Sequence, residues 1–464
     1  MNNFTSVIAA VSTPPGKGGV AIIRISGDGA LDVAARVFKP RSEKSFLEAK
    51  PRMQTRGDIL YLGEIIDDGM ATYFKAPNSY TGEDVVELAC HGGMLVTSAV
   101  LESVFAAGAM PAGPGEFTRR AFINGKLSLV EAEAIGNLLE AESYAQIKLA
   151  SSKSRGILAK KIAEQRETLT SVLSSIYARI DYPDEDLGDF TDEEAVAILK
   201  DVNKKIDSLI ATYATGRAVK EGIKTVICGK TNVGKSSLYN ILVGYDAAIV
   251  TDIEGTTRDV LSEKIPLGKV MLRLYDTAGV RDECRADAVE RIGIERSLER
   301  ISDCELILAV FDASRELDSD DEKIICELKK ALGRKIAILN KCDLGQKTDK
   351  SMLGDFFDYV LEISASADQA RALSEIKDAI EALFTDEKIS IGEDAVISSA
   401  RQNSALTSAR ELIDSAIMGF LSGMSADAVS SDIERALGKI AELDGRAVSE
   451  EVVADIFSKF CVGK

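Results

Sequence analysis

The spacing of apolar residues divides this 464-residue chain into four segments. Residues 1–125 contain short apolar runs separated by glycine and proline, a pattern typical of the strands and turns of an α+β domain. Residues 126–216 and 386–464 repeat apolar side chains at helical spacing, which predicts a helical domain in two parts. Residues 217–385 combine strand-like apolar runs with helical patterns, which predicts an α/β domain.

The order of these segments suggests that the α/β domain is inserted into the helical domain. The helical pattern that precedes residue 217 resumes after residue 385, and insertion is tolerated where the ends of the inserted segment lie close together. The predicted fold class is therefore multidomain, with an N-terminal α+β domain, an all-α helical domain and an inserted α/β domain.

A glycine-rich motif opens the α/β domain. Residues 229–236 read G-x-x-x-x-G-K-S, follow the apolar run 223–228 and precede a helical segment, which is the context of a phosphate-binding P-loop. Backbone N–H groups of such a loop wrap phosphates, while Lys235 reaches the outer two phosphates and Ser236 ligates Mg²⁺. The predicted nucleotide contacts in this motif are Asn232, Val233, Gly234, Lys235, Ser236 and Ser237.

Two further motifs follow at positions suited to switch segments. Residues 255–259 read G-T-T-R-D, and the Thr257 hydroxyl is expected to complete the Mg²⁺ shell. Residues 276–279 read D-T-A-G after a strand-like run. Asp276 can hold the metal through water, and the Gly279 amide can sense the terminal phosphate. The remaining predicted contacts of these motifs are Gly255, Thr256, Thr277 and Ala278.

The last two motifs identify the base. Residues 340–343 read N-K-C-D at the end of a strand-like run. Asp343 offers two acceptors to guanine N1–H and its amino group, whereas adenine presents a lone pair at N1 and is repelled. The predicted contacts are Asn340, Lys341, Asp343, Ser364, Ala365 and Ser366. Five motifs in this order predict a Ras-like P-loop GTPase domain that binds GTP.

The residue after Gly279 is Val280, so the water-orienting glutamine of the Ras-like pattern is missing. Two features could replace it. One is Asn232, near which a monovalent cation could sit, and the other is the set of carboxylates within residues 281–296. A solvated helix start is the alternative for that charged segment, since charge runs usually form solvated faces.

Composition limits the remaining functions. The net charge of −18 argues against broad binding to nucleic acid, because phosphate affinity rests on many Lys and Arg contacts. The chain shows no run of eighteen apolar residues and no signal-peptide pattern, so we expect a cytoplasmic protein with no membrane partner. The seven cysteines include no C-x-x-C pair and His91 is the single histidine, which argues against structural zinc and a His-rich metal site.

Two charged residues interrupt apolar runs of the N-terminal domain. Arg24 lies within the run 20–25 and Glu87 within the run 84–90. Buried charges are disfavoured unless they are paired. The two residues therefore either pair with each other or sit at strand edges, or they line a polar ligand pocket. Lys126, which follows Asn-Gly, is by itself consistent with an exposed turn lysine.

Several motifs resemble those of the bacterial family of tRNA uridine-modification GTPases known as MnmE or TrmE. The resemblance covers the whole chain and rests, beyond the five nucleotide motifs, on residues 13–19, 24–27, 79–84, 91–93, 114–119 and 460–464. It implies an N-terminal domain that dimerises and binds 5-formyl- or 5,10-methylene-tetrahydrofolate. The residues at the family's folate-contacting positions are Arg24, Glu87, Lys126 and Lys464. Cys461 matches a cysteine of the family, with a structural role and a role in the modification both open.

The resemblance also implies that K⁺ substitutes for an arginine finger. The matching K⁺ ligands are Asn232, Thr251, Ile253 and Thr256, and the water-orienting glutamate falls on Glu290. The residues of this loop counted among the GTP contacts are Thr251, Asp252, Ile253, Glu254, Gly255, Thr256 and Thr257. The catalytic set implied is Glu290, Lys235 and Thr257, with Ser236 and Thr257 as Mg²⁺ ligands.

The function implied by the resemblance is modification of the wobble uridine of certain tRNAs. The family forms homodimers and works in a heterotetramer with a flavin-containing partner, MnmG (GidA), which carries FAD and NADH. That partner is expected to hold much of the tRNA. A ribosome-assembly switch that binds RNA without modification chemistry is the alternative, and the basic RNA-binding tail that would favour it is absent from the sequence.

Overall fold

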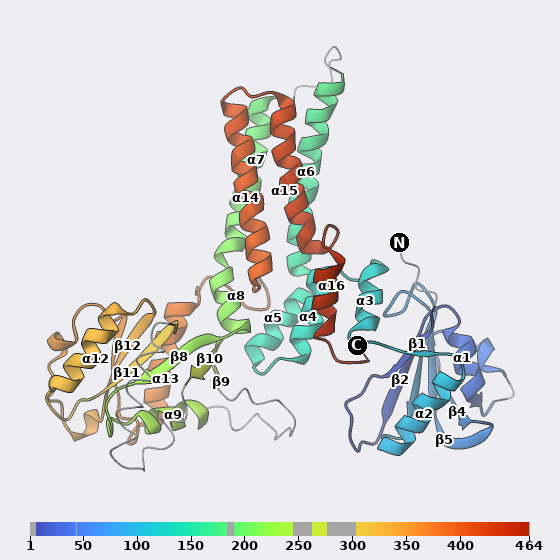
Figure 1. Cartoon of the computed structure of the whole chain (residues 1–464), viewed down its shortest axis with the longest axis horizontal. Helices are drawn as coiled ribbons and strands as arrows, with labels where there is room; N and C mark the ends of the chain where they lie inside the picture. Colours follow the sequence, from blue (N-terminus) through green and yellow to red (C-terminus); the bar gives the residue numbers. More distant parts are fainter. Residues whose placement is uncertain (1–5, 43, 183–189, 245–261, 276–302, 464) are drawn as a thin grey trace. The chain divides into compact units, whose positions relative to one another are not determined.

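The computed structural model describes residues 6–42, 44–182, 190–244, 262–275 and 303–463 (Figure 1). The chain forms two compact units. The first contains Met1–Leu139, Lys153–Val202 and Glu411–Lys464, and the second contains Glu140–Ser152 and Asn203–Arg410. Among the described residues, none of the helices combines the length and the apolar character needed to cross a membrane.

The N-terminal part of the first unit is built on a mixed sheet whose strand order is β3-β4-β5-β6-β2-β1-β7. Its strands are β1 (Ile8–Val11), β2 (Ala21–Ser26), β3 (Phe38–Pro40), β4 (Gln54–Tyr61), β5 (Glu64–Phe74), β6 (Val85–Cys90) and β7 (Met110–Pro111). Helices α1 (Ala30–Val37) and α2 (Met94–Ala106) pack on it, and a 3₁₀ turn covers Phe46–Glu48.

Alternation along β2 and β6 separates the two faces of this sheet. Ile23, Ile25, Val86 and Leu88 are buried in the core that includes residues of α1 and α2. Because side chains of a strand alternate between faces, the residues between them lie on the opposite face. The antiparallel register places Arg24 directly opposite Glu87 there.

The first unit also contains helices that bring distant segments together. They are α3 (Glu116–Ile123), α4 (Leu129–Leu139), α6 (Ile157–Asp181), α15 (Ala426–Asp444) and α16 (Glu450–Ser458). Helices α6 and α15 lie side by side (Figure 1). Arg166 of α6 pairs with Asp444 of α15, and the Tyr177 hydroxyl donates to Glu434 at 2.5 Å. Helices α7 (Asp192–Ala211) and α14 (Ala400–Leu421) continue from one unit into the other.

The second unit is built on a sheet with strand order β13-β12-β11-β8-β10-β9. Its strands are β8 (Ile223–Cys228), β9 (Ser262–Leu267), β10 (Val270–Tyr275), β11 (Leu306–Asp312), β12 (Arg334–Asn340) and β13 (Tyr359–Glu362). All neighbouring strands are parallel except β9 and β10. The other elements are α5 (Tyr144–Ser154), α8 (Tyr213–Lys220), α9 (Lys235–Gly244), α12 (Ser319–Lys330), α13 (Gln369–Phe384) and 3₁₀ turns at Cys342–Leu344 and Lys350–Leu353.

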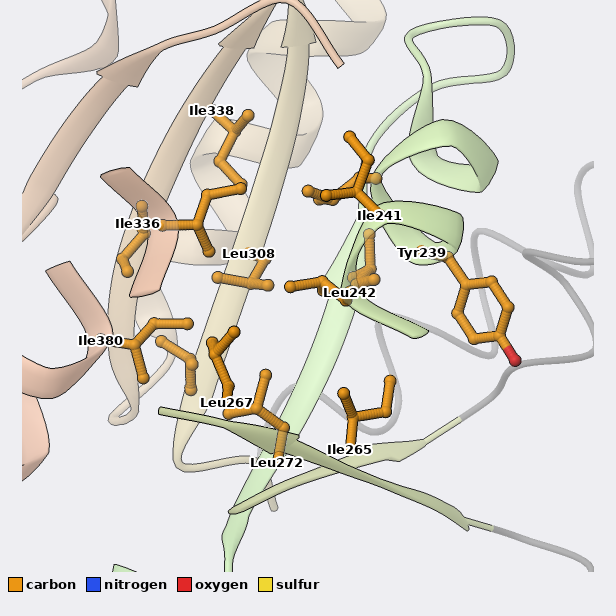
Figure 2. Packing of buried hydrophobic residues seen from close by; sticks show 14 of the residues in the cluster. Tyr239, Ile241, Leu242, Ile265, Leu267, Leu272, Leu308, Ile336, Ile338 and Ile380 are labelled. Atoms are coloured by element: carbon orange, nitrogen blue, oxygen red, sulfur yellow. The ribbon is translucent and has the colours of Figure 1, made fainter. Parts of the chain in front are cut away.

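Both faces of this sheet are covered. On one face, Leu308, Ile336 and Ile338 pack with Leu242 of α9 and Ile380 of α13 (Figure 2). A second cluster on the same strands includes residues of α12. Burial on two faces explains why β11 and β12 are continuous apolar runs rather than alternating ones. The sheet of the first unit, the helices and this parallel sheet confirm the predicted fold class.

The segments that lead into and out of this sheet are fastened to each other within the second unit. The Thr212 hydroxyl oxygen accepts from the backbone N–H of Ile397 at 3.1 Å, and that of Thr215 accepts from Asp386 N–H at 3.0 Å. A Cβ built on Gly216 would lie 2.0 Å from the Ile397 carbonyl oxygen. Close approach of the two segments therefore depends on a glycine.

Two glycine-to-alanine substitutions in helices are expected to change stability in opposite directions. Gly216→Ala places a methyl group against the Ile397 carbonyl, so it should lower the free energy of unfolding by about 1–3 kcal/mol. Gly438→Ala in α15 meets no atom within 4 Å and should raise it by about 0.5–1 kcal/mol. Urea unfolding followed by circular dichroism measures both changes, and a Gly216→Ala variant as stable as the parent would contradict the contact.

Candidate functional site

The P-loop lies between β8 and α9 and is packed against the ends of two other strands. Gly229 has φ +144°, and a Cβ there would lie 2.3 Å from the Val310 carbonyl oxygen of β11. Gly234 has φ +101°, and its Cβ would lie 2.1 Å from Asn340 Nδ2 of β12. The left-handed backbone and the lack of space both require glycine at these two positions. The sequence G-x-x-x-x-G thus fits this loop onto the carboxyl edge of the sheet.

Lys235 and Ser236 form the first turn of α9. Lys235 is buried, and its ammonium group donates to the carbonyl oxygen of Lys230 at 2.6 Å. The cation therefore lies over the loop at the positive end of a helix, where backbone N–H groups face an incoming anion. This arrangement suits the phosphates of a nucleotide.

Asn340 joins the P-loop to the segment 364–366. Its Nδ2 donates to the Val233 carbonyl at 2.9 Å, and its Oδ1 accepts from the Ala365 N–H at 2.9 Å. Asn340 and Val233 are buried, as is Ala365. One amide side chain therefore fixes the spacing between two of the predicted motifs.

Lys341 and Asp343 follow on the same loop. Lys341 has φ 64° and ψ 33°, and its ammonium donates to the Asn232 carbonyl at 2.5 Å and to Asp312 Oδ2 at 2.7 Å. Asp343 accepts from the Ser364 hydroxyl at 2.5 Å. The structure thus brings together the predicted residues of 232–237, 340–343 and 364–366, with Ser237 in the first turns of α9 and Ser366 in the last segment.

The other predicted residues of the nucleotide site lie outside the described part of the chain. They are Thr251, Asp252, Ile253, Glu254, Gly255, Thr256, Thr257, Asp276, Thr277, Ala278, Gly279 and Glu290. Lys464 of the predicted folate site also lies outside it.

A second polar site occupies the sheet face of the first unit that carries Arg24 and Glu87. Arg24 donates from Nε at 3.0 Å and from Nη2 at 2.9 Å to Glu87 Oε1. Its guanidinium lies over the rings of Tyr80 and Phe117, with centroid distances of 5.2 and 5.6 Å. The Nη1 atom is buried and has no hydrogen-bond partner among the described residues. The two charges pair, as the first alternative from the sequence has it, and one guanidinium N–H group still needs an acceptor.

Lys126 contacts the loop that carries Tyr80. Its ammonium donates to the Pro77 carbonyl at 3.0 Å, while the neighbouring Asn124 donates to the Thr81 carbonyl at 2.8 Å. Arg24 and Lys126 therefore both contact residues 77–82, although more than one hundred positions separate them in sequence. Burial raises the pKa of Tyr80, and its contacts with Thr118 and Arg24 offset this only in part.

A buried network next to this pair is not predicted by the sequence. Arg120 is fully buried and donates to Ser6 O at 2.9 Å, to Glu116 at 2.9 Å and to Glu83 at 3.2 Å. Glu83 also accepts from the Ser26 hydroxyl at 2.8 Å. The four-residue spacing of Glu116 and Arg120 was the one available signal, since such residues face each other on a helix.

The segment before Lys464 lies against the first strand of the same unit. The Ser12 hydroxyl donates to the Gly463 carbonyl at 3.0 Å, and Val462 bridges to Pro114. Gly463 has φ +100°, and a Cβ there would lie 2.1 Å from the Val11 carbonyl. The glycine of the terminal motif is thus required by close packing, and Cys461, two residues earlier, is exposed.

A group with metal-ligand chemistry lies on β5 and β6. The ligand atoms of Asp67, Asp68 and His91 lie within 4.8 Å of one another. His91 Nδ1 lies 2.7 Å from Asp67, which raises the pKa of the imidazole. Asp68 accepts from Arg56 at 2.9 Å and from Arg41 at 3.4 Å. Arg41 and Arg56 pair with Asp68, and the His91 ring and backbone N–H contact Asp67, so the cluster is best described as a set of side-chain pairs.

Comparison with known proteins assigns the family. A family model described as "GTP-binding protein TrmE N-terminus" matches residues 7–126, and one described as "MnmE helical domain" matches residues 129–461. Proteins named tRNA modification GTPase MnmE are 38% identical in Thermoanaerobacter pseudethanolicus, 38% in Clostridioides difficile and 40% in Thermotoga petrophila. Each match covers 98% of this chain and 99% of the relative. The chain belongs to the MnmE family of tRNA modification GTPases. It is therefore a GTP hydrolase that acts in tRNA modification.

A solved structure is similar to part of the chain. The G domain of the T. maritima FeoB iron transporter is 21% identical, with a TM-score of 0.24, over 34% of this chain and 96% of that chain.

The bridging role of Asn340 predicts the effect of its removal. Asn340→Ala leaves the Val233 carbonyl and the Ala365 N–H without their partner, so the second unit should lose about 1–3 kcal/mol of stability. The control is Gln346→Ala, which removes an exposed hydrogen bond to Glu362 in the same unit and should cost less than about 0.5 kcal/mol. Denaturant unfolding without nucleotide compares them, and equal midpoints would refute the buried bridge.

Proposed function

We propose that this chain is a K⁺- and Mg²⁺-dependent GTPase that works with a flavin-containing partner, MnmG (GidA). Together they would form 5-carboxymethylaminomethyluridine or aminomethyluridine at the tRNA wobble position, using a one-carbon unit of tetrahydrofolate. The observation that supports this most is the end-to-end match to the family. One chain thereby carries both the nucleotide motifs and the polar N-terminal site.

In the nucleotide site, five of the predicted residues have a specific proposed task. Lys235 reaches the outer phosphates, Ser236 and Thr257 ligate Mg²⁺, and Asp343 binds guanine N1–H and its amino group. Glu290 orients the attacking water. The described geometry supports this assignment, because Asn340 holds the P-loop and the segment 364–366 at a fixed separation.

The proposed K⁺ ligands are Asn232, Thr251, Ile253 and Thr256. Asn232 has φ +59°, and its carbonyl already accepts from Lys341. Its side-chain amide makes no hydrogen bond to the described residues and is exposed, so its oxygen is available to a cation. A monovalent cation there would offset the negative charge that develops on the phosphates.

The folate site is proposed at Arg24, Glu87, Lys126 and Lys464. The residues present fit such a ligand, because the buried Arg24 Nη1 has no acceptor in the described part of the chain and aromatic rings line its surroundings. A planar heterocycle with acceptor atoms can accept from Arg24 Nη1, and carboxylates of the ligand can pair with Lys126 and Lys464. The tetrahydrofolate derivative supplies the one-carbon unit when bound, while Arg24 and Glu87 orient its ring.

The proposed assembly is a homodimer that forms a heterotetramer with the partner, which would carry FAD and NADH. The net charge of −18 favours a basic partner that holds much of the tRNA. GTP turnover would then drive a change in domain arrangement.

The cation hypothesis predicts that GTP hydrolysis in K⁺ is at least about tenfold faster than in Na⁺, because K⁺ takes over part of the charge stabilisation of an arginine finger. Asn232→Ala should remove most of the difference. Hydrolysis is measured at saturating Mg²⁺ and GTP, with and without the purified partner and tRNA. Equal rates in the two salts for the parent protein would refute K⁺ dependence.

The folate hypothesis predicts that Arg24→Ala weakens binding of 5-formyl-tetrahydrofolate by about tenfold or more, since it removes a buried charged donor. Arg41→Ala is the matched control, because Arg41 pairs with Asp58 and Asp68 on the exposed side of the same sheet. Calorimetry measures the affinity, and circular dichroism checks folding. Undiminished affinity in a folded Arg24→Ala variant would argue against this site.

A further inference from the structure

Asp312 lies at the end of β11, beside the loop that follows β12. The parallel register pairs Asp312 with Asn340, the last residue of β12. Lys341, the first residue of the loop that follows β12, therefore lies next to Asp312. Asp312 is 8% exposed. None of the five sequence motifs includes this residue.

The two oxygens of Asp312 have different partners. Oδ1 accepts from the Ser314 N–H at 3.0 Å and from the Ser314 hydroxyl at 2.6 Å, which shapes the turn after the strand. Oδ2 accepts from the Lys341 ammonium at 2.7 Å. Although burial raises the pKa of this carboxyl, the hydrogen bonds from Lys341 and Ser314 outweigh it and lower the pKa. The carboxylate is therefore charged at neutral pH.

The ammonium of Lys341 connects this carboxylate to the P-loop. The same nitrogen donates to the carbonyl of Asn232, so it lies between the ends of β11, β12 and the P-loop. Lys341 and Asn232 both have left-handed backbones, with φ 64° and 59°. Such conformations are disfavoured for residues other than glycine and persist where surrounding contacts hold them.

We propose that Asp312 is a positioning residue for nucleotide binding, whose carboxylate fixes Lys341 so that one ammonium group holds the P-loop at Asn232. The ammonium of a lysine lies at the end of a flexible side chain and has no preferred direction of its own. The buried Asp312 carboxylate holds the Lys341 ammonium in one direction. The inference rests on the proposed role of Lys341 in nucleotide binding. It does not depend on K⁺, the folate site or the partner.

The alternative is that Asp312 only shapes the turn through Ser314. Asp312→Asn separates the two roles, because the amide oxygen can still accept from Ser314 while the amide NH₂ replaces the acceptor that faces Lys341. A Ser314→Ala variant removes one of the turn contacts and leaves the Lys341 contact in place.

The test measures GDP affinity by fluorescence titration and KM and kcat for GTP. Asp312→Asn should weaken GDP binding by about tenfold and raise KM for GTP by a similar factor, since a charge-assisted hydrogen bond is lost. Its kcat at saturating GTP should change by less than about threefold, because the reacting phosphate is not touched. Ser314→Ala should bind GDP like the parent protein.

A double-substitution cycle shows whether the effect passes through Lys341. Lys341→Met should weaken GDP binding, and adding Asp312→Asn to it should cause no further loss. Additive losses would overturn the proposal in favour of a purely structural role. If Asp312→Asn alone folds poorly, Lys341→Met can still be compared with the double variant, because the double variant contains no unpaired charge at this position.

Two failures are distinguishable in this experiment. Parental affinity in Lys341→Met would remove the proposed role of Lys341 in nucleotide binding and leave that of Asp343 untouched. Parental affinity in Asp312→Asn, with weakened binding in Lys341→Met, would overturn only the positioning role of Asp312.

Discussion

The buried amide of Asn340 is the contact on which the nucleotide site depends. It accepts from one segment and donates to another, and Gly234 leaves only enough space for it, since a Cβ would approach Nδ2 to 2.1 Å. An unpaired buried amide costs free energy. Separating the P-loop, the loop 340–343 and the segment 364–366 would leave the Asn340 amide unpaired, so the three segments keep their positions together. The parallel sheet makes this possible, because the strands that precede these segments end at the same edge.

The sequence was sufficient to predict the fold class and the positions of these three motifs. A P-loop is recognisable because its glycines, lysine and serine occur at fixed spacing between a strand and a helix, and apolar strands buried on both faces are continuous runs. The alternation that places Arg24 and Glu87 opposite the apolar core is also visible in sequence. Whether they pair was open, since the register of β2 against β6 depends on the folded sheet.

The remaining contacts could not be predicted, because they join residues that no local pattern connects. Asp312 is the last residue of an apolar strand, and no sequence motif includes it. Its link to Lys341 follows from the order of the strands in the sheet. The contact of Ser12 with Gly463 joins the two ends of the chain. Arg120 reaches Ser6, more than one hundred residues away. Single-sequence periodicity describes neighbours along an element and contains no information on such pairs.

The same physical rule explains both polar sites in a chain whose net charge is −18. A cation withdrawn from water is stable only when a carboxylate or carbonyl faces it. Arg120 is fully buried, Arg24 and Lys341 are half-buried, and each has such partners. Lys341 uses its contacts to hold the P-loop backbone at Asn232, and Arg120 connects Ser6, Glu83 and Glu116. Arg24 lies over the rings of Tyr80 and Phe117, and its buried Nη1 has no acceptor among the described residues. An aromatic surface beside a buried guanidinium nitrogen that needs an acceptor suits a planar ligand with acceptor atoms, and the combination of these two features distinguishes this site from the purely polar contacts of Arg120 and Lys341.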